Sequence, residues 1–159
     1  MFASGLLNNL RTVCNLSRRF IHIGETAEIT KTFTAEDVRL FSEISEDRNP
    51  VHLDTEYAKT SQFGRCIVHG VLSNGLISSV LGNKLPGFGT IFISQQIEFP
   101  NPLYVGEAVT AKVEVLEIRK RLVTFQTICF KPDDKKVVLQ GTAKILLPKP
   151  PTNSTKPAS

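Results

Sequence analysis

Cysteine is scarce in this sequence, with three residues in a chain of 159. Cys14, Cys66 and Cys129 form no CxxC pair, and none of them stands at metal-ligand spacing from a histidine. The pattern excludes a disulfide framework as the source of stability and gives no zinc-finger type of metal site. We therefore expect buried apolar thiols or isolated surface thiols, in a reducing compartment.

Long hydrophobic runs are also lacking. No stretch of about 18 or more consecutive apolar residues occurs, so the sequence predicts no transmembrane helix. The stretch from Ile67 to Leu81 comes closest, but Asn74, Gly75, Ser78 and Ser79 interrupt it. Such a run is typical of a helix buried inside a folded domain.

The excess of positive charge lies at the two ends of the chain, whose formal net charge is +4. Residues 1–20 hold three arginines and no acid, and residues 148–159 hold two lysines and no acid. The body between them therefore carries a formal charge of −1. Because the body lacks an excess of basic residues, we expect no nucleic-acid partner.

The N-terminal segment combines this basic character with an apolar face. Leu6, Leu10 and Val13 recur at intervals of three or four, which places them on one side of a helix, and the first acid is Glu25. An amphipathic, arginine-bearing, acid-free N-terminus is typical of a mitochondrial presequence. We predict a targeting presequence over residues 1–21 and a location in the mitochondrial matrix. The alternative is a first helix of the folded domain.

The remainder divides into a body and a tail. Residues 148–159 are rich in proline, serine and threonine and have little to bury, so we predict a disordered tail. Residues 22–147 form the one domain that a chain of this length allows. Their apolar and charged content is ordinary for a globular domain, since the whole chain is 41% hydrophobic and 21% charged.

The spacing of apolar residues predicts the order of elements in the body. Thr34 and Asp37 form a helix-capping signal, and helical spacing follows as far as Ser45. The apolar run over residues 67–82 predicts a long buried helix. Alternation predicts strands over residues 23–33, 90–99, 109–115, 122–129 and 137–147. This order favours an α+β hotdog fold, an antiparallel sheet wrapped around a long central helix, although other α+β folds share it.

One polar segment carries residues suited to chemistry. Asp47 and His52 stand five residues apart on either side of Asn49 and Pro50. Pro50 cannot continue a helix and biases Asn49 toward an extended conformation, so we expect a turn that folds the two side chains toward one point. General acid–base catalysis requires such groups within reach of one water or substrate. The alternative is a polar loop without a chemical role.

The pattern Asp47-x-Asn49-Pro50-x-His52 resembles the motif of the MaoC-like (R)-specific hydratase/dehydratase family. The resemblance extends over about residues 23–147 and includes the segments Phe63–Gly70, Leu85–Gly89 and Phe99–Leu103. With its predicted presequence, the chain resembles the mitochondrial members of the family. The sequence departs from the family at Glu46, where many members have glycine. We expect this difference to alter the rigidity of the loop and not its chemistry.

The resemblance implies a hotdog fold and a hydro-lyase activity. The implied reaction is the reversible dehydration of (3R)-3-hydroxyacyl thioesters to trans-2-enoyl thioesters in mitochondrial fatty-acid synthesis. The substrate would be carried by acyl carrier protein or coenzyme A. The resemblance implies no cofactor and no metal ion, and it implies a homodimer.

The resemblance also implies roles for individual residues. Asp47 and His52 resemble the pair that holds a water and moves protons, with Asp47 favoured for the proton at C2 of the substrate. Asn49 matches the position that orders the loop. Gly70, at the expected start of the buried helix, matches the donor of an N–H group to the thioester oxygen, although close packing alone would also require a glycine. Ser78 matches a position near the substrate, with core packing as the alternative.

Other readings stay open at this point. His69 is expected to be structural and to lie outside the catalytic pair. A hotdog thioesterase would share the fold and the thioester but would attack the carbonyl with water. A catalytically silent module that binds acyl thioesters is a further alternative.

Overall fold

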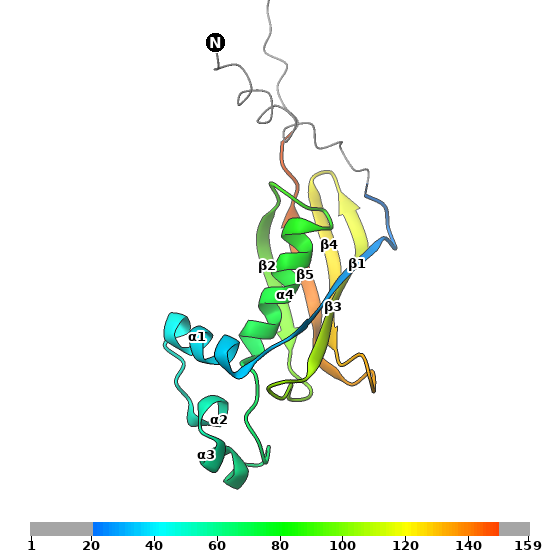
Figure 1. Ribbon diagram of the computed structural model, residues 1–159. Coiled ribbons are helices and arrows are strands. Elements are labelled where there is room, and N and C mark those ends of the chain that lie inside the picture. Colours follow the sequence, from blue (N-terminus) through cyan, green and yellow to red (C-terminus); the bar gives the residue numbers. More distant parts are fainter. Residues whose placement is uncertain (1–20, 150–159) are drawn as a thin grey trace, which may run out of the picture.

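The computed structural model describes residues 21–149 (Figure 1). Residues 1–20 of the predicted presequence and residues 150–159 of the predicted tail lie outside this range. One antiparallel sheet contains five strands in the order β1-β3-β4-β5-β2. The strands are β1 (Thr26–Thr32), β2 (Ile91–Glu98), β3 (Ala108–Arg119), β4 (Leu122–Phe130) and β5 (Val137–Leu146). The helices are α1 (Ala35–Ser45), α2 (Pro50–Leu53), α3 (Thr55–Thr60) and α4 (Gly70–Asn83).

Helix α4 packs against one face of the sheet, which curves around it (Figure 1). Alternation along β4 puts Val123, Phe125 and Cys129 in the core with no exposed surface. Ile77 and Leu81 of α4 meet this layer and are equally buried. Because burial of apolar side chains is the main favourable term in folding, this contact holds the two layers together. The predicted α+β hotdog arrangement is confirmed.

The start of α4 differs from the prediction of a helix over residues 67–82. The helix begins at Gly70, and the preceding residues are extended. Ile67 forms an isolated antiparallel bridge with Tyr104, and the Val68 N–H donates to the carbonyl of Leu103 at 2.8 Å. A continuous apolar run does not distinguish a buried helix from a buried extended segment, which explains the error.

The segment that leads to the polar motif is fixed by helix capping. Thr34 caps α1, with its hydroxyl accepting from the Asp37 N–H at 3.1 Å and the Asp37 carboxylate accepting from the Thr34 N–H at 2.9 Å. Helix α1 ends at Ser45, as predicted. Glu46 then adopts a left-handed conformation with φ of 61°, a position where glycine costs less. This reverses the chain directly before Asp47.

The sheet has two edges, β1 and β2. β2 presents a run of large apolar side chains to solvent, since Ile91, Phe92 and Ile93 are 54%, 39% and 50% exposed. Among the described residues its partner strand is β5, with Ile97 opposite Gly141. Among residues 21–149, no helix is long and apolar enough to cross a membrane.

Candidate active site

Three separate segments meet at the N-terminal end of α4. The loop after α1 supplies Asp47, the short helix α2 supplies His52, and the residue before α4 supplies His69. One side-chain atom from each residue, a carboxylate oxygen of Asp47 and a ring nitrogen of each histidine, lies within 4.8 Å of the other two. The structure thus brings Asp47 and His52 together, as the turn predicted, and adds a second imidazole.

The loop that carries Asp47 is held by backbone hydrogen bonds. The Asn49 N–H donates to Oδ1 of Asp47 at 3.2 Å, and Oδ1 of Asn49 accepts from the Val51 N–H at 3.3 Å. Asn49 is therefore the cap of α2, whose first residue is Pro50. Asn49 is non-helical, with φ of −56° and ψ of 124°, as the following proline predicted. Pro50 then opens a short helix that was not predicted, because proline fits the first position of a helix while preventing α1 from continuing. The loop-ordering part predicted for Asn49 agrees with these contacts.

His52 has a defined tautomer. Its Nδ1 lies 2.8 Å from the carbonyl oxygen of Ile67, and a carbonyl can only accept a hydrogen bond. Nδ1 therefore carries a proton, and in the neutral ring Nε2 keeps its lone pair free for a substrate or a water. The neighbouring residue Val51 is buried, which anchors α2.

His69 lies at the start of the buried helix, as predicted, and it contacts both members of the pair. Its Nε2 lies 3.1 Å from the backbone oxygen of Asp47, and its ring stacks on that of His52 with centroids 3.8 Å apart and planes at 26°. The edge of Phe41 closes the other side, with centroids 5.0 Å apart. His69 is only 1% exposed. Its place directly before the buried helix was the signal in the sequence, but spacing alone could not show that α2 folds back onto it.

The pKa of His69 lies below its ordinary value. Burial is the main cause, because it penalises the charged imidazolium, and the nearby His52 acts in the same direction. The hydrogen bond to the Asp47 carbonyl opposes both. His69 is therefore neutral at pH 7.

Stability should depend on pH through His69. The pKa of His69 is lowered from 6.5 in the folded state. As the pH falls, His69 therefore binds a proton in the unfolded chain before it does so in the folded chain. The free energy of unfolding therefore decreases on acidification below about pH 6.5. We expect His69→Gln to flatten the decline of Tm between about pH 7 and pH 5, measured by thermal melts. Equal slopes for wild type and variant would contradict the assignment.

The start of α4 offers unpaired N–H groups. The helical hydrogen bonds begin with the Leu72 N–H, which donates to the His69 carbonyl at 3.0 Å. Within residues 21–149, the Gly70 and Val71 N–H groups have no acceptor. Together with the helix dipole they favour an oxygen that carries negative charge. The start of α4, where the N–H donor to the thioester oxygen was predicted, therefore has the unpaired N–H groups that this role requires.

Close packing also constrains Gly70. A Cβ at this position would lie 2.7 Å from Cε1 of Phe99, nearer than van der Waals contact permits. The two explanations for Gly70 are compatible. Close packing forbids a Cβ on its Cα, whereas the proposed hydrogen bond uses its backbone N–H. Ser78 lies about two turns further along α4 and is exposed, so its core-packing alternative is wrong.

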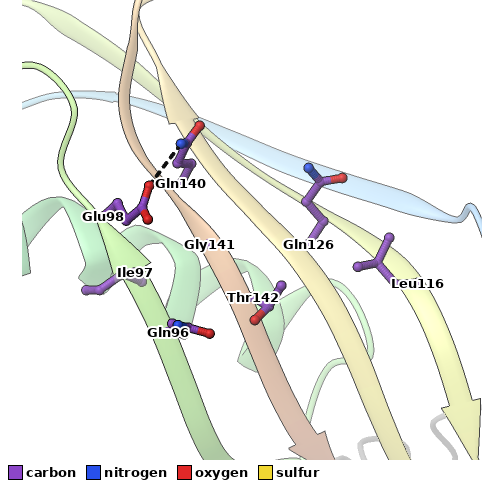
Figure 2. A pocket seen from close by; sticks show the side chains of 8 residues that line it. All are labelled: Gln96, Ile97, Glu98, Leu116, Gln126, Gln140, Gly141 and Thr142. Atoms are coloured by element: carbon purple, nitrogen blue, oxygen red, sulfur yellow. Dashed lines mark hydrogen bonds between the residues drawn. The ribbon is translucent and has the colours of Figure 1, made fainter.

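A hollow of about 500 Å³ lies beside His52. Its wall is formed by the start of α1, by α2 and by the segment before α4, including Arg39, Leu53, Arg65 and Cys66. A second hollow of about 530 Å³ lies on the face of the sheet away from α4 (Figure 2). It is lined by three glutamines, Thr142 and the apolar side chains of Ile97 and Leu116, and its one carboxylate, Glu98, accepts a hydrogen bond from Gln140 at 3.2 Å. Of the candidate residues, His52 lines the first hollow, whereas Asp47 and Gly70 line neither hollow.

Asp47, His52 and His69 are also a set that could be considered for a metal ion. The two imidazoles are stacked, however, and a ring nitrogen offers its lone pair in the plane of the ring. The lone pairs of His52 and His69 therefore run side by side and do not converge as tetrahedral coordination requires. The exposed Asp47 carboxylate and the free Nε2 of His52 suit a hydrogen-bonded water better.

Comparison with known proteins gives consistent results. The family model of the MaoC like domain matches residues 21–138. The (R)-specific enoyl-CoA hydratase of Rhodospirillum rubrum is 42% identical over 127 residues, covering 79% of this chain and 87% of that protein. The mitochondrial 3-hydroxyacyl-(acyl-carrier-protein) dehydratase of Arabidopsis thaliana is 32% identical over an alignment that covers 93% of this chain and 90% of that protein. A solved (R)-hydratase from A. caviae superimposes with a TM-score of 0.79 at 39% identity, over 82% of this chain and 99% of that one. The family model spans most of the body that contains Asp47, His52 and α4, and this chain belongs to the MaoC-like domain family.

Proposed function

We propose that this protein is a hydro-lyase that interconverts (3R)-3-hydroxyacyl thioesters and trans-2-enoyl thioesters. The observation that carries the proposal is the placement of the Asp47 carboxylate and the free Nε2 of His52 beside unpaired N–H groups at the start of α4. The hydratase and dehydratase names of the relatives support the same reaction class.

Dehydration requires a base, a group that assists departure of the hydroxyl, and a donor to the thioester oxygen. In the proposed mechanism Asp47 takes the proton from C2, and the electrons of that bond form the double bond as the C3 hydroxyl departs. The proton is passed to the departing hydroxyl, which Nε2 of His52 holds, so that one water leaves and the pair returns to its starting state.

The thioester oxygen gains negative charge as the C2 proton leaves. In the proposed complex it accepts from the Gly70 N–H, which no protein acceptor within residues 21–149 occupies. A fixed N–H donor at a helix start stabilises such charge without reorganisation during the reaction. Ser78 is proposed to lie along the acyl chain, consistent with its exposed position on α4.

The test is an assay of the purified chain with (3R) and (3S) 3-hydroxyacyl thioesters of several lengths. We expect formation of the enoyl thioester from the (3R) substrates alone, followed by ultraviolet absorbance. Equal use of both stereoisomers, or no turnover of either, would refute the proposal. Release of free thiol would indicate the thioesterase alternative, and binding without turnover would indicate a silent module.

We further propose that the substrate is linked to acyl carrier protein in mitochondrial fatty-acid synthesis. Support comes from the mitochondrial carrier-protein dehydratases of Arabidopsis thaliana and Solanum lycopersicum among the relatives, and from the acid-free basic N-terminus. Comparing kcat/KM for one acyl chain on carrier protein and on coenzyme A tests the carrier. A higher value on coenzyme A would count against carrier-linked synthesis.

Residues 1–21 are proposed to be the presequence. A reporter fused after residue 21 is expected to enter mitochondria and to lose the leader there, because the segment joins three arginines to an apolar face without an acid. Fractionation and size of the product measure both steps. Replacing the three arginines by glutamine is the matched control, and cytosolic retention of the unmodified fusion would exclude the assignment.

We also propose a homodimer that covers β2. A long apolar strand edge invites pairing, and β2 exposes Ile91, Phe92 and Ile93. We expect a dimer at micromolar concentration by sedimentation, and a shift toward monomer for Ile93→Asp. Thr26→Asp, on the exposed part of the opposite edge β1, is the control and should leave the dimer intact. A monomeric wild type would be inconsistent with the proposal.

A further inference from the structure

His69 occupies an unusual position between the two proposed catalytic residues. Its side chain forms a hydrogen bond with the backbone of Asp47 and stacks on the ring of His52, so it contacts both residues. The contacts are of different kinds: a directed hydrogen bond at 3.1 Å and a face-to-face stack at 3.8 Å. Of the standard side chains with one planar ring of this size, imidazole alone can make both at once.

The packing of the fold alone does not account for a histidine here. The Nε2 that faces the Asp47 carbonyl must carry the proton, because a carbonyl can only accept. The other nitrogen, Nδ1, is then an acceptor, and it is buried without a hydrogen-bond partner among the described residues. A buried polar atom without a partner loses its hydrogen bonds to water and gains none in the fold, so it is unfavourable. An apolar side chain would leave no unpaired nitrogen here, so the imidazole calls for another explanation.

The surroundings of His69 keep its ring neutral and fixed. The edge of Phe41 lies against it at 60°, and the residue is 1% exposed. The titratable groups that face it are Asp47, from the loop after α1, and His52, from α2. A neutral ring in this place adds no further charge beside the proposed pair.

We propose that His69 is a positioning residue that holds Asp47 and His52 in their reactive geometry, through its Nε2–H bond to the Asp47 backbone and its stack on the His52 ring. The inference rests on the proposed hydro-lyase function for its kinetic consequence. In this proposal His69 itself touches neither substrate nor water, since it is 1% exposed. It acts on turnover by limiting the positions of the two groups that do.

Three substitutions separate the two contacts. His69→Gln keeps an N–H donor and removes the ring, His69→Phe keeps the ring and removes the donor, and His69→Ala removes both. Ser73→Ala is the matched control, because Ser73 is also buried and lies one turn along α4. All are compared as full-length proteins at a temperature where circular dichroism shows complete folding.

We expect His69→Ala to lower kcat about 10²-fold with KM nearly unchanged, because a misplacement of about 1 Å in a catalytic group has an effect of this size. His69→Gln and His69→Phe should each recover part of the loss, and Ser73→Ala should behave as wild type. An unchanged kcat in fully folded His69→Ala overturns the proposal. So does a loss that appears in KM alone, or an equal loss in Ser73→Ala.

A spectroscopic measurement keeps the inference testable apart from the reaction. The stacked ring of His69 should shift the ring protons of His52 upfield in NMR spectra, and the shift should persist in His69→Phe and vanish in His69→Gln. If the wild type turns over no thioester, the hydro-lyase proposal fails while this measurement still decides the stacking. If the His52 signals do not respond to either substitution, the positioning inference fails even for an active enzyme.

Discussion

Asp47→Asn and His52→Ala are each expected to reduce turnover about 10²–10⁴-fold, the range for removal of a positioned acid–base group. The proposed reason is that each acts on a proton in the transition state. Asp47 is exposed and His52 is half-buried in a four-residue helix, so neither change empties the core. Activity should therefore fall while Tm stays close to that of the wild type.

The double variant gives the sharper result. Two residues that serve one water act as a unit, so losing both should cost much less than the product of the single losses. Asp133→Asn and His22→Ala are matched controls, because both residues lie outside the site and are exposed. If activity falls only in proportion to unfolding, or survives in the double variant, the assignment of the pair is wrong.

Gly141→Ala is expected to destabilise the domain strongly. Gly141 lies in β5 where β2 passes closest, and a Cβ there would stand 2.0 Å from the backbone oxygen of Gln96 (Figure 2). Backbone cannot rotate away as a side chain can, so the two strands must separate. We expect a loss of about 3 kcal/mol, at the upper end of the range for overpacking. This corresponds to a fall in Tm of roughly 10 °C.

The control for this prediction is the next residue in the strand. Thr142 is exposed on the outer face, so Thr142→Ala should change Tm by little. Thermal melts of the two variants and the wild type provide the comparison. A Gly141→Ala protein as stable as Thr142→Ala would show that β2 can shift away from β5 without loss of hydrogen bonds.

Much of the fold could be predicted because its patterns are local. Alternation in β4 and β5 reports which side chains face the core, and the capping box of Thr34 and Asp37 fixes the start of α1. The start of α4 was misplaced because Val68 is buried by a long-range contact with Leu103, which no local pattern contains.

The candidate site divides in the same way. Asp47, Asn49 and His52 lie in one short segment, so a sequence motif could join them. His69 is 17 residues beyond His52, and the two rings meet where Nδ1 of His52 bonds to the carbonyl of Ile67, two residues before His69. A contact of this kind depends on how two segments pack, and residue spacing carries no information about it.

The position of β2 in the sheet also has a consequence for folding kinetics. β2 precedes β3 in the chain, yet it pairs with β5, and the side-chain bond between Glu98 and Gln140 spans 42 residues. Pairing between strands so far apart in sequence slows folding. While the chain is being synthesised, the apolar strand β2 emerges well before its partner and stays unpaired until β5 follows. Chains that end before Val137 therefore lose the pairing of two strands and are the ones we expect to aggregate.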